Sequence, residues 1–115
     1  MRRSAREIRE EIIATVLRNG GHLASSLGAV ELSMALAEAF DPERDRVVWD
    51  VGHQAYAWKI LTGRGGRFGS IRTLGGLSPF LDPAESPADA AVSGHAGSAL
   101  SVALGLAAAR DRRGG

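Results

Sequence analysis

The sequence predicts an α/β protein with parallel strands flanked by helices, and three observations support this. Apolar residues recur at helical spacing in several segments of the 115-residue chain. Residues 46–51 are β-branched and aromatic, and residues 90–93 form a second, weaker apolar segment; both are typical of short strands. These two segments alternate with the helical ones, and this order is characteristic of parallel sheets covered by helices.

The first helix is expected to begin near Ser4, because Ser4 and Glu7 have the spacing of a capping box. Gly20 and Gly21 are expected to end it, since glycine readily adopts the backbone conformation that follows a helix. Between them, one apolar stripe recurs at helical spacing: Ile8, Ile12, Ile13, Val16 and Leu17.

A second helix is expected over residues 29–40. It is apolar on nearly every side, so we expect it to be buried on more than one face. Residues 54–61 are expected to be helical as well, followed by a glycine-rich loop around a short helix at 68–74. After an irregular, proline-containing stretch at 77–87 and the second strand, an Ala/Leu-rich helix is expected to run to about Arg110.

Two strands do not make a stable parallel sheet, because such sheets are buried on both faces. The sequence therefore predicts one incomplete domain over residues 1–115. Trp49 and Trp58 are expected in its core.

Composition excludes several classes of function. The net charge of +1 gives no electrostatic footprint for nucleic acid or an anionic membrane. The chain has no cysteine, which excludes disulfides and thiolate metal sites. The longest apolar run, Leu100 to Ala109, is about half of the ~20 residues that span a bilayer. The first residues do not resemble a secretion signal, so we expect a cytoplasmic protein.

Two sites share one design, in which a predicted strand ends in Gly-His and a helix follows. They are Gly52-His53 and Gly94-His95, the latter followed by Ala96. Ligands of open α/β sheets bind at the carboxyl ends of strands, and helix N-termini offer free N–H groups to anions. Each site is thus a candidate phosphate cradle. The alternative for each is an ordinary surface turn.

A third histidine, His22, also follows a glycine, and here helix capping by polar loop residues is the simpler interpretation. The stretch from Gly63 to Gly76 contains Arg64, Arg67 and Arg72 and could meet a phosphate. It matches no Walker pattern, so we interpret it as a mobile surface loop. No spacing typical of a metal site occurs, and no carboxylate is assigned a catalytic role.

Read as whole strings, these motifs resemble the 1-deoxy-D-xylulose 5-phosphate synthase family, in that family's order and spacing. The resemblance runs from about Ile8 to Arg110 and rests on four strings: Gly21-His-Leu-Ala-Ser-Ser-Leu-Gly-Ala-Val-Glu-Leu32, Trp49-Asp-Val-Gly-His-Gln-Ala-Tyr56, Lys59-Ile-Leu-Thr-Gly-Arg64 and Gly75-Gly-Leu-Ser-Pro-Phe80. Glu85-Ser86 and Asp89, before the last Gly-His, also fit the family.

The resemblance implies a partial, transketolase-like domain that binds thiamine diphosphate. The family condenses pyruvate with glyceraldehyde 3-phosphate, releases carbon dioxide and uses magnesium, in isoprenoid and thiamine biosynthesis. By this match, His53 contacts the cofactor, and Gly94, His95 and Ala96 line its diphosphate side. His22 matches the histidine on the substrate side, which implies a catalytic role. A homodimer is implied for the full enzyme.

Two departures from the family pattern accompany the resemblance. Ala96-Gly97-Ser98 stands where the family usually has Ser-Ser-Thr, so one hydroxyl donor is missing. The Gly-Asp-Gly motif and the asparagine that hold magnesium would lie beyond residue 115. Two classes of function therefore remain for the chain: a segment of the synthase, or a non-catalytic truncated or split-gene module that acts only with a partner chain.

Overall fold

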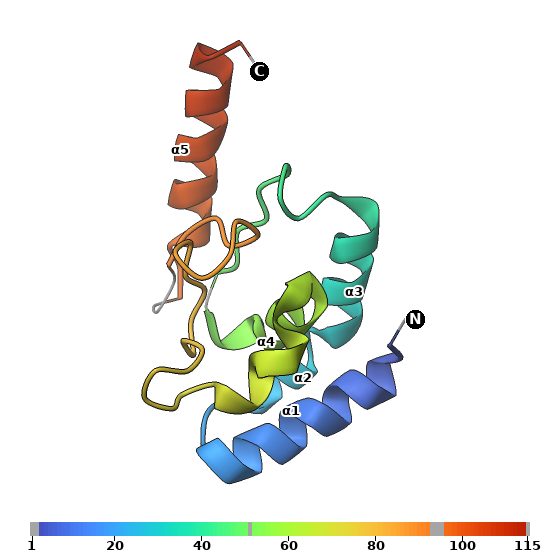
Figure 1. Ribbon diagram of the computed structural model, residues 1–115. Helices are drawn as coiled ribbons and strands as arrows, with labels where there is room; N and C mark the ends of the chain where they lie inside the picture. Colours follow the sequence, from blue (N-terminus) through green and yellow to red (C-terminus); the bar gives the residue numbers. More distant parts are fainter. Residues whose placement is uncertain (1–2, 51, 93–95, 115) are drawn as a thin grey trace.

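The computed structural model describes residues 3–50, 52–92 and 96–114, and this part of the chain folds into helices joined by long irregular segments (Figure 1). The helices are α1 (Ala5–Asn19), α2 (Ala24–Leu27), α3 (Val30–Ala39), α4 (Tyr56–Lys59) and α5 (Ala99–Arg112). Shorter helical turns complete the order: η1 (Gly52–Gln54), η2 (Ile60–Arg64) and η3 (Gly65–Ser70). A kink at Thr62 and Gly63 separates η3 from α4.

The predicted parallel-strand α/β fold is wrong, because no strand occurs in the part of the chain that the structure describes. A strand needs a neighbouring backbone to pair its N–H and C=O groups, and strand-prone composition does not supply one. At residues 46–50 and 90–92 no such ladder forms. The Arg46 guanidinium donates to the carbonyl oxygen of Pro87, three residues before the second segment, over 3.3 Å.

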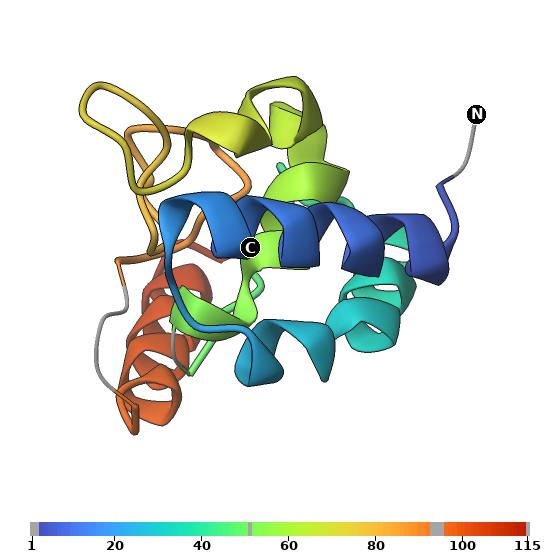
Figure 2. The same cartoon turned by 90° about the horizontal axis from the view of Figure 1, so that it is seen from below.

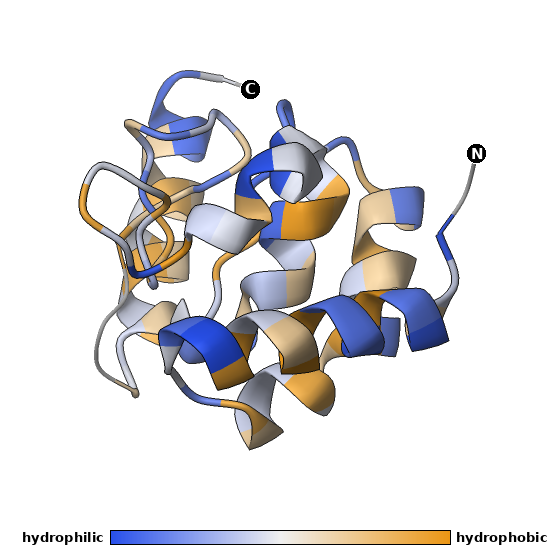
Figure 3. Ribbon diagram, turned by 60° about the horizontal axis from the view of Figure 1, so that its bottom comes forward, coloured by the Kyte–Doolittle hydropathy of each residue, from blue (hydrophilic) through white to orange (hydrophobic). Residues whose placement is uncertain are grey.

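Helix α1 begins as the sequence predicts. The Ser4 hydroxyl oxygen accepts from the N–H of Glu7 at 3.1 Å, and Gly20 ends the helix with φ at +82°. The buried stripe is narrower than expected, however, and consists of Ile8, Ile12 and Val16. The other two apolar residues expected there are exposed, Ile13 by 36% and Leu17 by 78%. Figure 2 shows α1 lying along one side of the helical group, and Figure 3 shows hydrophilic and hydrophobic segments alternating along it.

The core consists of two adjoining clusters. The larger joins α1 and α3 to α4 and η3, with these members: Ile8, Ile12, Val16, Val30, Tyr56, Ala57, Ile60, Phe68, Ile71 and Leu77. The smaller surrounds Trp49 and Trp58, whose rings lie 5.9 Å apart. Both tryptophans are buried, as the sequence predicts. Because α4 contributes to both clusters, the turn that precedes it, η1, is fixed relative to α1 and α3.

Two helices are more exposed than the sequence suggests. In α3 only Val30 and Ser33 are buried, and Leu32 is 55% exposed. The helix packs against both clusters, through Met34 on one and Leu36 and Ala37 on the other, so it is buried on more than one side but less deeply than expected. Helix α5 has the predicted position but no buried residue, and it projects from the rest of the molecule (Figure 1). Its Leu100 and Leu104 face solvent. Among the described residues, no helix has both the length and the apolar character needed to cross a bilayer.

The stripe on α1 gives a matched pair for testing the packing. Replacing Ile12 by Ala removes a fully buried side chain, and we expect the free energy of unfolding to fall by about 2–4 kcal/mol. Replacing the neighbouring Ile13 by Ala should cost less than about 1 kcal/mol, because that side chain is already partly in water. Thermal or denaturant unfolding of the chain measures both. Equal losses would contradict the assigned face of α1.

Candidate functional site

The rings of His22 and His53 lie against each other, with centroids 3.7 Å apart and planes inclined by 35°. His53 belongs to η1, and His22 precedes α2, 31 residues earlier in the chain. Both line one pocket of about 680 Å³. The segment after η3 supplies its other wall, which includes Arg72, Ser78, Pro79 and Phe80. The structure thus brings together two of the histidines that the sequence singles out.

A close approach of backbone to side chain fixes the segment that carries His22. Gly21 has φ at +128°, which a residue with a side chain rarely adopts. A Cβ at this position would lie 2.9 Å from the hydroxyl oxygen of Tyr56 and 3.3 Å from Cδ of Arg72. Tyr56 is fully buried. Glycine before His22 is therefore required by both conformation and space.

Helix α2 holds the backbone of His53. The Ser26 hydroxyl, which is fully buried, donates to the carbonyl oxygen of His53. The Ser25 hydroxyl points to the same oxygen at 3.4 Å. Since α2 follows His22 directly in the chain, these bonds connect the backbones that carry the two imidazoles. Local spacing in the sequence does not predict this contact, because the serines and His53 are 27 and 28 positions apart.

The environment of His53 favours its neutral form. Burial lowers the pKa of His53 below its ordinary value, and positive charge on His22 and on Arg72 lowers it further. The Phe80 ring contacts the imidazole in a T-shaped arrangement, with centroids 4.9 Å apart. A neutral imidazole has one donor and one acceptor nitrogen, so His53 is suited to hydrogen bonding rather than to pairing with an anion as a cation.

The second Gly-His site is described only in part, because Gly94 and His95 lie outside the described residues. Ala96 is exposed. A carboxylate oxygen of Asp50 accepts from the N–H groups of Gly97, at 2.9 Å, and Ala99, at 3.2 Å. The residues just before His53 are therefore bonded to those just after His95. Asp50 caps the N-terminus of α5 from 49 residues away, a role that local spacing does not predict.

The glycine-rich stretch from Gly63 to Gly76 lies only partly on the surface, because residues 72–76 are exposed whereas Arg64, Phe68 and Ile71 are buried. Arg64 is 2% exposed and bonded to carboxylates, so it is not available to a phosphate. Arg72 is the arginine of this stretch that reaches the pocket of the two histidines. It has φ at +64°, an unusual conformation for a residue with a side chain.

The donor set of this pocket fits an aromatic cofactor that carries phosphate groups. Two imidazoles and one guanidinium supply hydrogen bonds and charge, and Leu77, Pro79 and Phe80 supply apolar surface. The described residues do not offer a comparable set of ligands for a metal ion. No group of three or more His, Cys, Asp or Glu side chains that could hold a metal ion occurs among the described residues.

Replacing Arg72 by Gln should raise the pKa of His53 toward its ordinary value near 6.5, because one of the positive charges that lower it is removed. Replacing Arg67, which does not line this pocket, by Gln should leave that pKa unchanged. The pH dependence of carbethoxylation at His53, resolved by peptide mass spectrometry, measures the shift. Identical profiles for the two variants would show that Arg72 does not act on His53.

Comparison with known proteins agrees with the strings quoted above. The family model described as 1-deoxy-D-xylulose-5-phosphate synthase matches residues 1–115. The chain is 61% identical over 110 residues to 1-deoxy-D-xylulose-5-phosphate synthase 2 of Geobacter sulfurreducens, covering 96% of this chain and 18% of that protein. It is 57% identical over 110 residues to the synthase of Thermus thermophilus, with the same coverage of both chains.

A third relative, the synthase of Oleidesulfovibrio alaskensis, is 54% identical over 114 residues, which are 99% of this chain. The chain spans about a fifth of the length of these curated relatives, 18% in each case, and corresponds to their N-terminal segment. With a family model matched over its whole length and identity above one half to these relatives, the chain belongs to the 1-deoxy-D-xylulose-5-phosphate synthase family.

Proposed function

We propose that this chain supplies the N-terminal part of an enzyme that condenses pyruvate with glyceraldehyde 3-phosphate, with loss of carbon dioxide, to give 1-deoxy-D-xylulose 5-phosphate. The observation that carries the proposal is the close contact of the His22 and His53 rings in one pocket, with centroids 3.7 Å apart, in a chain of this family. The pocket presents proton-transferring groups beside apolar surface, as the chemistry requires. A homodimer and a cytoplasmic location stay predictions.

The cofactors of the proposed enzyme are thiamine diphosphate and Mg²⁺. When bound, thiamine diphosphate supplies the carbanion stabilisation that lets a decarboxylated two-carbon unit attack an aldehyde. On this chain, His53 would contact the cofactor, and Gly94, His95 and Ala96 would line the side of its diphosphate. The ligands of Mg²⁺ would come from the remainder of the enzyme, since the resemblance to the family puts the Gly-Asp-Gly motif and the asparagine beyond residue 115.

His22 and His53 would serve different steps. The neutral imidazole of His53, held through its carbonyl oxygen by α2, is suited to orient the cofactor by a hydrogen bond. His22 is exposed and lines the same pocket, where it could hold or move a proton at the substrate oxygen. Arg72 lies in the same pocket and offers a guanidinium to an anionic group.

The test uses a chimera in which this chain replaces the matching segment of the Geobacter sulfurreducens synthase. We expect it to form 1-deoxy-D-xylulose 5-phosphate. Replacing His53 by Ala should weaken cofactor binding by about 1.5–3 kcal/mol, through loss of a hydrogen bond to a charged ligand. Replacing His22 by Ala should leave cofactor affinity nearly intact and lower turnover by about 10²–10⁴-fold. Calorimetric titration and steady-state rates measure these effects.

Two results would contradict the assignment of roles: the same pattern for both substitutions, or loss of cofactor binding as the main effect of His22→Ala. A folded chimera that binds the cofactor but forms no product would favour the alternative, a module without catalytic capacity of its own. Ser4→Ala, far from the pocket at the start of α1, is the control and should leave both measurements unchanged.

A further inference from the structure

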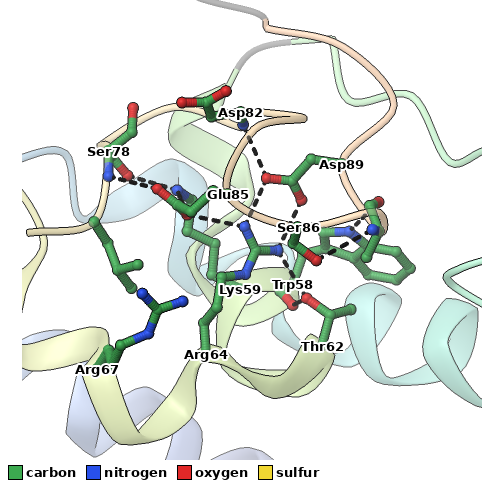
Figure 4. Close-up of polar contacts among 12 residues, drawn as sticks. Trp58, Lys59, Thr62, Arg64, Arg67, Ser78, Asp82, Glu85, Ser86 and Asp89 are labelled. Carbon is green, nitrogen blue, oxygen red and sulfur yellow. Dashed lines mark hydrogen bonds and ion pairs between the residues drawn. The ribbon is translucent and has the colours of Figure 1, made fainter.

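The segment between η3 and α5 has no helix or strand in its described part, residues 71–92 and 96–98, yet four charged side chains anchor it to α4 and η2 (Figure 4). Lys59 and Arg64 come from the helical side, and Glu85 and Asp89 come from the segment. The side chains of Lys59 and Asp89 are fully buried, and that of Glu85 is 11% exposed. Charges this deeply buried are stable only when they are paired.

One ion pair holds both polar backbone atoms of Ser78. The ammonium of Lys59 donates to the carbonyl oxygen of Ser78 at 2.6 Å and to Oε1 of Glu85 at 2.7 Å. The other oxygen of Glu85 accepts from the N–H of Ser78 at 2.9 Å. The position of this residue is thus set by side chains rather than by a helix or a sheet.

Ser78 begins the stretch that forms a wall of the histidine pocket. Ser78, Pro79 and Phe80 all line that pocket. The Ser78 hydroxyl accepts from the N–H of Phe80 at 3.1 Å, and the Phe80 ring meets the His53 imidazole edge-on. A chain of direct contacts therefore runs from the buried ion pair, through Ser78, to the ring that contacts His53.

From this geometry we infer that Lys59 and Glu85 are positioning residues for the pocket: by holding Ser78 they place Phe80 against His53. The inference rests on the proposed function, since it assigns to the pair the shape of that same site. Neither residue lines the pocket of the two histidines. Displacement of Ser78 would uncover His53 and misplace a ligand bound beside it, and a shift of about 1 Å can cost about 10²-fold in rate.

Asp89 offers a matched control. It is a buried carboxylate paired with Arg64, through bonds of 2.6 and 2.7 Å, and it accepts from the backbone N–H of Asp82 at 2.9 Å. Its chemistry therefore resembles that of Glu85, which bonds two cations, Lys59 and Arg64, and one backbone N–H. The difference is that Asp82 does not line the histidine pocket.

The experiment compares Glu85→Ala, Glu85→Gln and Asp89→Ala in the chimera described above. The first readout is the rate of carbethoxylation of His53 relative to the exposed His22, without cofactor or substrate. We expect about a fivefold rise for Glu85→Ala, and recovery of most of the protection in Glu85→Gln, which keeps an oxygen for the N–H of Ser78. Asp89→Ala should lower the Tm by about as much as Glu85→Ala does. It should nevertheless change the rate of His53 modification relative to His22 less than twofold.

The second readout is catalytic. At a temperature where all variants are folded, kcat/KM should fall about tenfold in Glu85→Ala and less than twofold in Asp89→Ala. Equal effects of the two alanine variants on His53, or no effect of either, would overturn the inference. If Glu85→Ala does not fold, Lys59→Met takes its place, because Glu85 stays paired with Arg64 in that variant. Lys59→Met removes the bond to the carbonyl oxygen of Ser78, so it must raise the rate of His53 modification relative to His22. A parent chimera without activity would count against the proposed function alone, since the modification ratio still decides the inference.

Discussion

Lys59 and Arg64 place two positive charges inside a small helical protein, and much of the rest of the structure follows from their neutralisation. Glu85 and Asp89 supply the balancing charges, at distances of 2.6–2.9 Å. Breaking a buried pair by removing one partner leaves an uncompensated charge, which typically costs about 3–5 kcal/mol. The irregular segment that carries the two carboxylates is therefore constrained to lie over α4 and η2.

The pairing also explains how a segment without helix or strand satisfies its backbone. The N–H groups of Ser78 and Asp82 bind the carboxylates of Glu85 and Asp89, respectively. Burial alone would raise the pKa of Glu85, but hydrogen bonds from Lys59 and from the N–H of Ser78 lower it below its ordinary value. Because the folded pKa is depressed, this contribution to stability is present above the unfolded pKa, near 4.3, and is lost as the pH falls through the folded pKa.

The sequence predicts those features that depend on neighbouring residues. The Ser4 cap, the Gly20 end of α1, and the helices α3 and α5 follow from local spacing, and the structure confirms them. Contacts between distant residues were not predictable in this way. Lys59 and Glu85 are 26 residues apart, and Arg64 and Asp89 are 25. Arg64 lies in a glycine-rich stretch that predicts a surface loop, and nothing around it in the sequence indicates burial.

The predicted strands and the candidate site also depend on contacts between residues far apart in the sequence, which local spacing does not predict. Residues 46–50 have the composition of a strand, but composition does not provide a partner backbone, and the structure shows no strand there. At the site, the Gly-His motif indicated His53, and the resemblance to the family indicated His22. Their stacking required the close packing at Gly21 and the serine bonds to the His53 carbonyl, which connect residues 27 or more positions apart.

The most direct test of this account is hydrogen exchange at the backbone N–H groups of Ser78 and Asp82, measured in the chimera by mass spectrometry. If the buried carboxylates hold the irregular segment, both amides should exchange at least about 100-fold more slowly than in an unstructured peptide. In Glu85→Ala the backbone N–H of Ser78 should exchange faster than in the unsubstituted chimera. In Asp89→Ala the same should hold for the backbone N–H of Asp82. Exchange of both amides at the unstructured rate in the unsubstituted chimera would contradict the account.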